Sequence, residues 1–235
     1  MKNVHVSWDN RMVLDSFSWQ LQAGQHTLIR GPNGCGKTTL LKLITGDNPQ
    51  VYANDITIFG LKRGSGESIW DIKSDIGYIS YQLHLDYLYH GHASLEETLL
   101  SGFHDSIGLY SPAGSSEIGP MNQWLAIMGL SEKRHAPFVS LSWGEQRAAL
   151  VARAAIKNPR LLILDEPCHG LDTVHRQRVL AVAEQIAQMG HSTLIHVTHD
   201  PTERLSCIRQ TLDFVPMSKI QDVPENQPRY RCVWS

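Results

Sequence analysis

Gly31-Pro32-Asn33-Gly34-Cys35-Gly36-Lys37-Thr38-Thr39 is the stretch that decides the fold of this chain. It fits the pattern G-x-x-x-x-G-K-[ST], a loop whose backbone N–H groups wrap a triphosphate. Residues 26–30 before it predict a strand, and residues 40–44 after it predict a helix. The positive N-terminal end of that helix would point at the bound anion. Because the strand and helix flank the loop, a chance glycine-rich turn explains the match poorly.

The side chains of this loop predict a site for a triphosphate and Mg²⁺. Its glycines allow unusual backbone angles and a close approach to the phosphates. Lys37 can reach the β and γ phosphates, and the Thr38 hydroxyl can bind Mg²⁺. The predicted contacts are Gly31, Pro32, Asn33, Gly34, Cys35, Gly36, Lys37, Thr38 and Thr39.

Length and composition limit the class of protein. The chain of 235 residues can bury one substantial core, and its net charge of −2 gives no basic field for nucleic acid or anionic membrane. The apolar runs are too short for a membrane span, and the first residues carry no apolar signal region. The four cysteines lack C-x-x-C pairing, which favours a reduced, cytoplasmic compartment.

A second chemical motif follows a short apolar run. Residues 161–164 (LLIL) are typical of a buried parallel strand, and Asp165, Glu166 and Pro167 come directly after it. In a phosphate-loop protein, Asp165 would hold Mg²⁺, usually through water. Glu166 would face the attacking water as a general base, an effect of about 10²–10⁴ in rate. The simpler interpretation is that two acidic residues end a strand in a turn. The presence of the phosphate loop favours the catalytic interpretation.

The hydrophobic pattern predicts an α/β fold. Strands alternate with helices, which argues for a parallel sheet covered on both faces. We expect strands within 4–29 joined by a polar turn at 9–11, and further strands at 54–60, 161–164 and 193–197. Helical patterns cover 94–130, 148–157 and 177–189, with a surface loop at 111–120.

The sequence Leu141-Ser142-Trp143-Gly144-Glu145-Gln146-Arg147 resembles the L-S-G-G-Q signature of the ATP-binding cassette (ABC) ATPases. Trp143 replaces a glycine, whereas Ser142 and Gly144 keep a hydroxyl and a backbone N–H. The resemblance implies that these two residues contact the γ-phosphate of ATP held by a second cassette, an anion site at a helix end. A serine N-cap on an amphipathic helix is the simpler interpretation, and the two are compatible.

This resemblance spans the chain and implies a fold. It implies a P-loop NTPase of the ABC type, with a parallel core sheet, an antiparallel β subdomain and a helical signature subdomain. Residues 1–235 would form one nucleotide-binding domain, with the helical subdomain at about 90–150.

The same resemblance implies roles for further residues. His199 would sense the γ-phosphate and act in catalysis, and residues 170–172 would couple the two sites of a dimer. Trp8, 29 residues before Lys37 (37 − 8), would stack on adenine, a contact of about 1–3 kcal/mol. A tryptophan packed in the core is the competing interpretation of Trp8.

One family position departs from the pattern. Gly77-Tyr78-Ile79-Ser80 leads to Tyr81 where the family commonly has glutamine, and Gln82 comes one residue later. Either a local bulge brings Gln82 to Mg²⁺ and the attacking water, or this role is weakened. His84, His90 and His92, with Asp86, would bind a metal only if they converged. Otherwise they form a polar loop.

Several segments, including 45–50, 59–73 and 83–87, resemble the second cassette of a twin-cassette subgroup associated with molybdate transport. The resemblance implies an ATPase that binds Mg-ATP and hydrolyses it in a composite site when cassettes dimerise, as the ATP-binding component of a molybdate-type transporter. The alternative is a soluble twin-cassette ATPase acting on a macromolecular or stress-related target. The partners would be a second cassette, as homodimer or twin, and a membrane permease at the inner face of the membrane; no nucleic acid is expected. Glu166 and His199 make a regulator without turnover a poor alternative.

Overall fold

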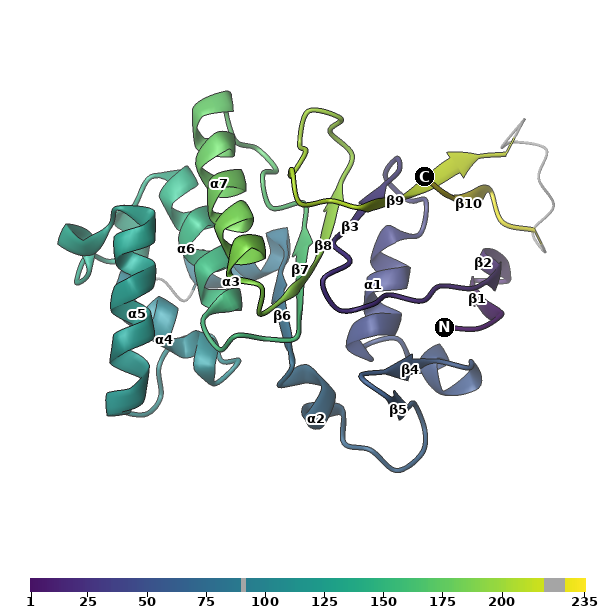
Figure 1. The fold of residues 1–235 in the computed structure, drawn as a ribbon, viewed down its shortest axis with the longest axis horizontal. Coiled ribbons are helices and arrows are strands. Elements are labelled where there is room, and N and C mark those ends of the chain that lie inside the picture. The colour runs from purple at the N-terminus through teal and green to yellow at the C-terminus, as the bar shows by residue number, and fades with distance from the viewer. Residues whose placement is uncertain (90–91, 218–226) are drawn as a thin grey trace.

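A six-stranded, mostly parallel sheet forms the centre of the computed structural model, which describes residues 1–89, 92–217 and 227–235 (Figure 1). The strand order is β10-β9-β3-β8-β7-β6, and only β10 runs antiparallel to its neighbour. The strands are β3 (Thr27–Arg30), β6 (Ile76–Ile79), β7 (Leu161–Asp165), β8 (Thr193–Thr198), β9 (Gln210–Pro216) and β10 (Tyr230–Trp234). The predicted α/β class is confirmed.

Strand β7 shows why the sheet is covered on both faces. Successive side chains of a strand point to opposite faces. Leu162 and Leu164 belong to one buried cluster, and Leu161 and Ile163 belong to the other. Helix α1 (Lys37–Thr45) contributes to the second cluster, whereas α6 (Trp143–Ala155) and α7 (Thr173–Met189) contribute to the first. A continuous apolar run therefore forms a strand buried on both sides.

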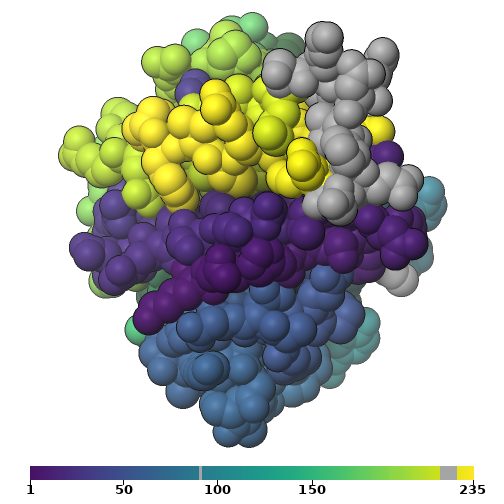
Figure 2. Space-filling view, turned by 90° about the vertical axis from the view of Figure 1, so that its right-hand side faces the viewer, coloured from purple at the N-terminus to yellow at the C-terminus, as the bar shows by residue number. Residues whose placement is uncertain are grey.

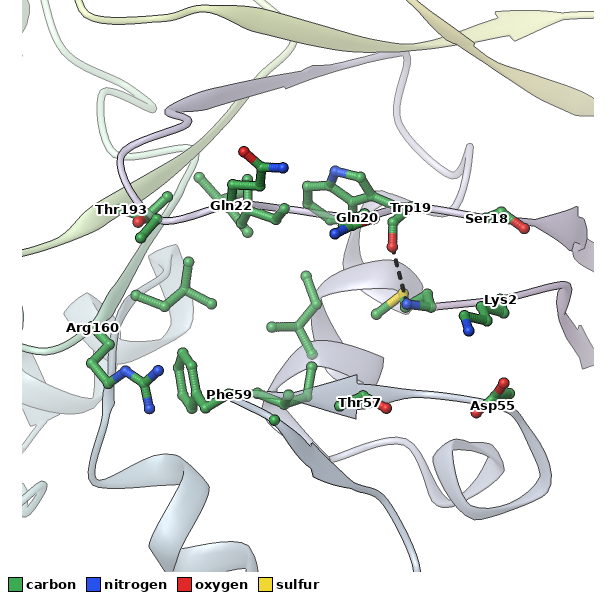
Figure 3. Close-up of a pocket in the computed structure, with 18 residues that line it drawn as sticks. Lys2, Ser18, Trp19, Gln20, Gln22, Asp55, Thr57, Phe59, Arg160 and Thr193 are labelled. Carbon is green, nitrogen blue, oxygen red and sulfur yellow. Dashed lines mark hydrogen bonds between the residues drawn. The ribbon is translucent and has the colours of Figure 1, made fainter.

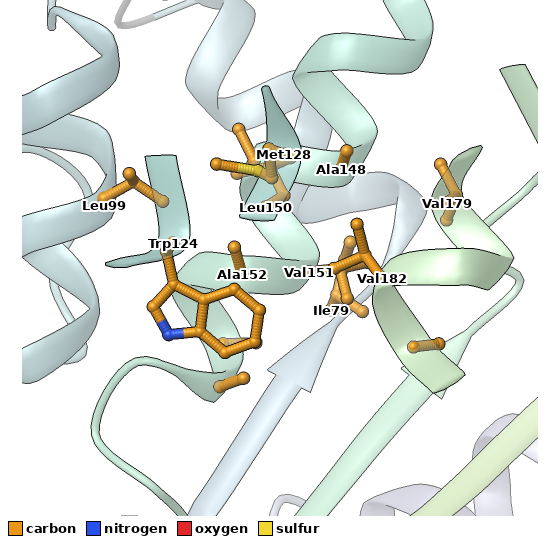
Figure 4. Close-up of a cluster of buried hydrophobic side chains, with 14 of the residues drawn as sticks. Ile79, Leu99, Trp124, Met128, Ala148, Leu150, Val151, Ala152, Val179 and Val182 are labelled. Atoms are coloured by element: carbon orange, nitrogen blue, oxygen red, sulfur yellow. The ribbon is translucent and has the colours of Figure 1, made fainter. Parts of the chain in front are cut away.

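A group of helices lies between β6 and β7 in the chain and on one side of the molecule (Figure 1). It contains α3 (Tyr81–Tyr89), α4 (Leu95–Leu100), α5 (Ser115–Met128) and α6. The buried alanines of α6, Ala148 and Ala152, meet Leu99 of α4 and Trp124 of α5 in one core (Figure 4). Small side chains on α6 let neighbouring helices pack closely around it.

The surface loop predicted for 111–120 is wrong from Ser115 onward, where α5 begins. The carboxylate of Glu117 accepts a hydrogen bond of 2.8 Å from the Gly114 N–H at the helix start. Met121, Trp124 and Leu125 are buried along one face. Burial of this apolar face outweighs the local loop tendency of serine, glycine and proline.

Two small antiparallel pairs complete the fold. Strands β1 (Val4–Trp8) and β2 (Arg11–Phe17) form the predicted hairpin, with Asp9 and Asn10 at φ of 48° and 63° in its turn. Aspartate and asparagine tolerate such angles better than most residues. The strand predicted for 54–60 is shorter than expected: β4 (Thr57–Ile58) pairs with β5 (Leu61–Lys62), and Asp55 forms an isolated bridge with Lys2.

The β1–β2 hairpin is held against the last strand. The Trp234 ring of β10 stacks on the ring of Phe17, the last residue of β2, with centroids 6.5 Å apart. Figure 2 shows the N-terminal residues as a band between this C-terminal strand and the segment that follows α1. The remaining elements are the helix α2 (Ile69–Lys73) and the 3-10 helices η1 (Pro49–Ala53), η2 (Ser101–Phe103), η3 (Ser131–Lys133) and η4 (Phe138–Ser140). In the described ranges, every helix is too short or too polar to cross a bilayer.

Candidate functional site

The phosphate loop connects the end of β3 to the start of α1. Gly36 caps α1 with a φ of 112°, a left-handed conformation that favours glycine. A Cβ at Gly36 would lie 2.8 Å from Cγ1 of Val13, and one at Gly31 would lie 2.7 Å from the Cys35 Sγ. Glycine is therefore required at both positions by backbone angle and by packing. Cys35 is buried beneath the loop, and burial raises the pKa of its thiol.

Lys37 folds back over this loop. Its Nζ donates hydrogen bonds to the backbone oxygens of Gly31 (2.7 Å) and Pro32 (3.1 Å). The same atom lies 3.9 Å from Oε1 of Glu166. The buried ammonium group thus stands between the loop and the carboxylates at the end of β7.

A cavity of about 550 Å³ opens above the loop. Trp8 lies in its wall with 46% of its surface exposed. The interpretation of Trp8 as a core residue is therefore wrong. Val13 was not predicted as a site residue and also lies in the wall. The lining consists of Trp8, Val13, Asn33, Gly34, Gly36, Lys37, Thr38, Thr39, Tyr81, Asp165 and Glu166.

Asp165 presents a carboxylate to this cavity. Its Oδ2 accepts a hydrogen bond of 3.1 Å from the Tyr78 hydroxyl. Burial raises the pKa of Asp165, and the hydrogen bond from Tyr78 opposes that rise. The exposed Thr38 hydroxyl lines the same cavity. These hard oxygen donors beside a phosphate loop suit Mg²⁺, which is held by one or two carboxylates together with substrate phosphates.

Glu166 occupies an unusual backbone conformation at the end of β7. Its φ is 49°, and its N–H donates to the Val197 oxygen at 2.9 Å. Such outliers concentrate at functional sites, where surrounding structure holds them. The Glu166 Oε1 lies 3.1 Å from Nδ1 of His199, and its Oε2 lies 3.6 Å from Nδ1 of His169. The structure thus brings together the two residues predicted as catalytic.

The segment after β6 corrects the prediction for Gln82. Tyr81 lines the cavity, whereas Gln82 does not. Helix α3 begins at Tyr81, so the chain forms no bulge there. The Gln82 amide instead donates to Oδ1 of Asp86 at 2.9 Å, one helical turn later. The spacing from Gly77 already pointed to Tyr81 as the residue at this place.

The polar loop expected around His84 is also wrong. His84 lies in α3 and is buried, with Nε2 2.8 Å from Oε1 of Gln146 and its ring 4.4 Å from the ring of Trp143. Burial lowers the pKa of His84 to about 4. His90 lies outside the described residues. The part of the chain that the structure describes contains no group of three His, Cys, Asp or Glu side chains that could hold a metal ion.

Ser142 caps α6, as the simpler interpretation expected. Its Oγ accepts a hydrogen bond of 3.3 Å from the Glu145 N–H, and Glu145 accepts one of 2.9 Å from the Ser142 N–H. This capping box satisfies free donors at the helix start. Gly144 packs against His175, where a Cβ would lie 2.3 Å from Cδ2. Neither Ser142 nor Gly144 lines the cavity above the phosphate loop.

A larger cavity, of about 980 Å³, lies at the amino ends of the parallel strands (Figure 3). Its walls include Leu161 and Thr193, the first residues of β7 and β8, together with Trp19, Phe59 and Arg160. The Arg160 guanidinium carbon lies 4.4 Å from the centre of the Phe59 ring. Among its described lining residues there is no phosphate loop and no pair of adjacent carboxylates. Volume alone therefore does not identify the site.

Residues 14–169, which contain the loop, the signature and the carboxylates, match the family described as ABC transporter. The chain belongs to this family. It is 47% identical over 217 residues to the ABC transporter ATP-binding protein ModF of Escherichia coli (strain K12), covering 92% of the chain and 44% of ModF. The predicted resemblance, and with it the class of ABC ATPase, is confirmed.

Two further proteins illustrate the range of relatives. The zinc uptake system ATP-binding protein ZurA of Listeria innocua is 31% identical over 203 residues, covering 85% of the chain and 76% of ZurA. The structure of cbiO1 from Clostridium perfringens, part of the ABC transporter complex cbiONQ, superimposes with a TM-score of 0.73 at 21% identity, covering 90% and 82% of the two chains. That likeness concerns the fold. The chain spans less than half the length of ModF.

Proposed function

We propose that this cassette binds Mg-ATP above the phosphate loop and hydrolyses it when a second cassette completes the site. One observation carries the proposal. The Glu166 carboxylate lies 3.1 Å from His199 and 3.9 Å from Lys37, at the wall of the cavity that the phosphate loop lines. A carboxylate, an imidazole and an ammonium group thus meet where a γ-phosphate would lie.

Binding would use the loop and its surroundings. The loop N–H groups and the Lys37 ammonium would hold the phosphates, and Trp8 would stack on adenine. Thr38 and Asp165 would hold Mg²⁺, which neutralises phosphate charge. Gln82 has no part in this proposal, because its amide is directed to Asp86.

Hydrolysis would depend on Glu166 and His199. The Glu166 carboxylate would accept a proton from water placed in line with the γ-phosphate. His199 would orient this carboxylate from Nδ1 and, with both ring nitrogens protonated, donate from Nε2 to the charge that develops on the phosphate. Glu166 combines a positive φ with a side chain that lines the cavity.

The second cassette would supply the signature. Ser142 is exposed at the N-terminal end of α6 and does not line the cavity of its own chain. A helix end with free N–H groups attracts an anion. In the proposed dimer, the exposed Ser142 hydroxyl and the Gly144 N–H at this helix end would contact the γ-phosphate held by a neighbouring cassette. In this proposal residues 1–235 are one nucleotide-binding domain, and residues 90–150 are its helical subdomain.

The work driven by hydrolysis is proposed to be transport, with a membrane permease as partner. The resemblance to a molybdate-associated subgroup makes molybdate the first cargo to test, and the zinc uptake protein ZurA makes zinc the second. The second cassette would be another copy of this chain or a cassette of the same polypeptide, which the length of ModF also allows. Co-purification with a membrane subunit would support transport, whereas a complex without one would favour the alternative, a soluble twin-cassette ATPase.

Phosphate release from Mg-ATP, measured at saturating ATP, tests the proposal. Wild type should turn over, and Glu166→Gln should lose at least about 100-fold in rate while still binding ATP. Glu132→Gln, an exposed glutamate on η3, serves as the control and should keep the wild-type rate. Equal rates in Glu166→Gln and wild type would contradict the assignment of the base.

A further inference from the structure

The two oxygens of the Glu166 carboxylate have different neighbours. Lys37 Nζ and His199 Nδ1 face Oε1, at 3.9 and 3.1 Å. The closest approach of the His169 Nδ1 is instead to Oε2, at 3.6 Å. This separation suits an ion pair and exceeds a direct hydrogen bond.

The second contact matters because the end of a glutamate side chain rotates easily. The last torsion of glutamate is broad and roughly two-fold, so contacts at one oxygen leave the carboxylate plane free to turn. A partner at the other oxygen restricts that rotation. A general base needs a fixed direction toward the proton that it accepts, and misplacement by about 1 Å can cost about 10²-fold in rate.

The His169 ring is itself held in place. It meets the Tyr81 ring edge-on, with centroids 5.1 Å apart and planes at 66°. On α6, the Arg147 guanidinium carbon lies 5.3 Å from the centre of the Tyr81 ring. Arg147 is fully buried, and its Nη1 donates to the Ser80 oxygen at 3.4 Å. Contacts thus run from α6 through Tyr81 and His169 to Glu166.

We propose that His169 is a positioning residue for hydrolysis: it holds the second oxygen of Glu166, and Tyr81 and Arg147 connect that contact to the helix that begins after Ser142. The proposal rests on the proposed function, because it concerns the orientation of the proposed base. It assigns to Tyr81 a packing role in the cavity wall, where the chain lacks a glutamine.

Steady-state kinetics of three substitutions test the role of Nδ1. His169→Ala should lower kcat about 10- to 100-fold while KM for ATP stays within about twofold. His169→Asn keeps a donor near the position of Nδ1 and should recover part of kcat. His169→Gln places its donor farther out and should not. Recovery by Gln and not by Asn would overturn the proposal, as would a change confined to KM.

The Glu166→Gln background separates positioning from other roles. If His169 acts through the Glu166 carboxylate, adding His169→Ala to Glu166→Gln should cause no further loss of residual hydrolysis. ATP-induced dimers of Glu166→Gln should also persist. A multiplicative loss, or loss of these dimers, would show that His169 serves the fold or the interface and would overturn the proposal.

Two controls separate a specific role of His169 from loss of folding. His191→Ala removes an exposed histidine in the turn after α7 and should leave kcat and KM unchanged. The melting temperature of each variant shows whether it is folded. Wild-type protein that binds ATP without hydrolysing it would refute the proposed function itself. Wild-type turnover with full activity of His169→Ala would refute the role of His169 alone.

Discussion

Two cavities lie at opposite ends of the parallel strands of the central sheet, and their linings differ in chemistry. At the carboxyl ends of β3 and β7, a cavity of about 550 Å³ joins the phosphate loop to Asp165 and Glu166. At the amino ends of β7 and β8, a cavity of about 980 Å³ is lined by residues such as Trp19, Phe59 and Arg160. Ligands of open α/β sheets bind outside the carboxyl ends of the strands. The smaller cavity is the proposed ATP site because the phosphate loop, the Lys37 ammonium and the carboxylates meet there.

Removal of a cationic side chain from each cavity should give the largest difference in ATP affinity. Lys37→Ala removes a buried ammonium from the phosphate loop and should weaken ATP binding about 10- to 100-fold, the value of a lost charge-assisted contact. Arg160→Ala at the larger cavity should leave ATP affinity within about twofold. Isothermal titration calorimetry of both variants measures this. Comparable losses of ATP affinity in the two variants would contradict the assignment of ATP to the smaller cavity.

The two tryptophans should give a smaller contrast. Trp8→Ala should weaken ATP binding about 10-fold by removing a stacking surface, with no change in the binding of tripolyphosphate. Trp19→Ala, at the larger cavity, should lower the melting temperature and leave the affinity of the folded protein for ATP unchanged. Competition between ATP and tripolyphosphate provides the measurement. Equal losses for both ligands in Trp8→Ala would rule out stacking on adenine.

The smallest expected effect concerns stability and pH. Because burial raises the pKa of Asp165, the folded protein loses stability as the pH rises from the ordinary aspartate value toward the raised one, and the loss is complete above it. Asp165→Asn, whose oxygen still accepts from Tyr78, should raise the melting temperature of the nucleotide-free protein at pH 7 by ~1–3 °C. The gain should fade as the pH falls toward the ordinary aspartate value of 3.8.

Asp55→Asn, at the more exposed carboxylate of the larger cavity, is the matched control for that change. Its melting temperature should stay within about 1 °C of wild type, since surface substitutions have small effects. Thermal unfolding at several pH values compares the pair. Destabilisation by Asp165→Asn at pH 7 would reverse the sign expected from burial.

The sequence alone predicted those elements whose pattern lies within a few consecutive residues. The residues from Gly31 to Thr39 carry their own turn, cation and helix start, and the apolar run before Asp165 carries its own strand. The positions of the misassigned residues depend on where a helix begins or on contacts with residues far away in the chain. Helix α3 starts at Tyr81, and a shift of one residue on a helix turns a side chain by about 100°. That rotation places Tyr81 in the cavity and Gln82 beside Asp86.

The contacts of His169 and His84 were beyond sequence reasoning for a related reason. His169 meets Tyr81 only after β6 and β7 pair, and His84 is buried only after α3 packs beside Gln146 of α6. Tyr81 and Gln146 lie tens of residues away in the chain from His169 and His84. Periodicity within one segment carries no information about such contacts.

A mixing experiment tests most directly the claim that two cassettes share one site. Ser142→Arg and Glu166→Gln should each be nearly inactive alone, with folding checked by the melting temperature. A mixed dimer would hold one intact site, with Glu166 from one chain and Ser142 from the other. Random pairing should therefore restore about a quarter of wild-type hydrolysis. Full activity of Ser142→Arg alone, or an inactive mixture in which mixed dimers are shown to form, would contradict the claim.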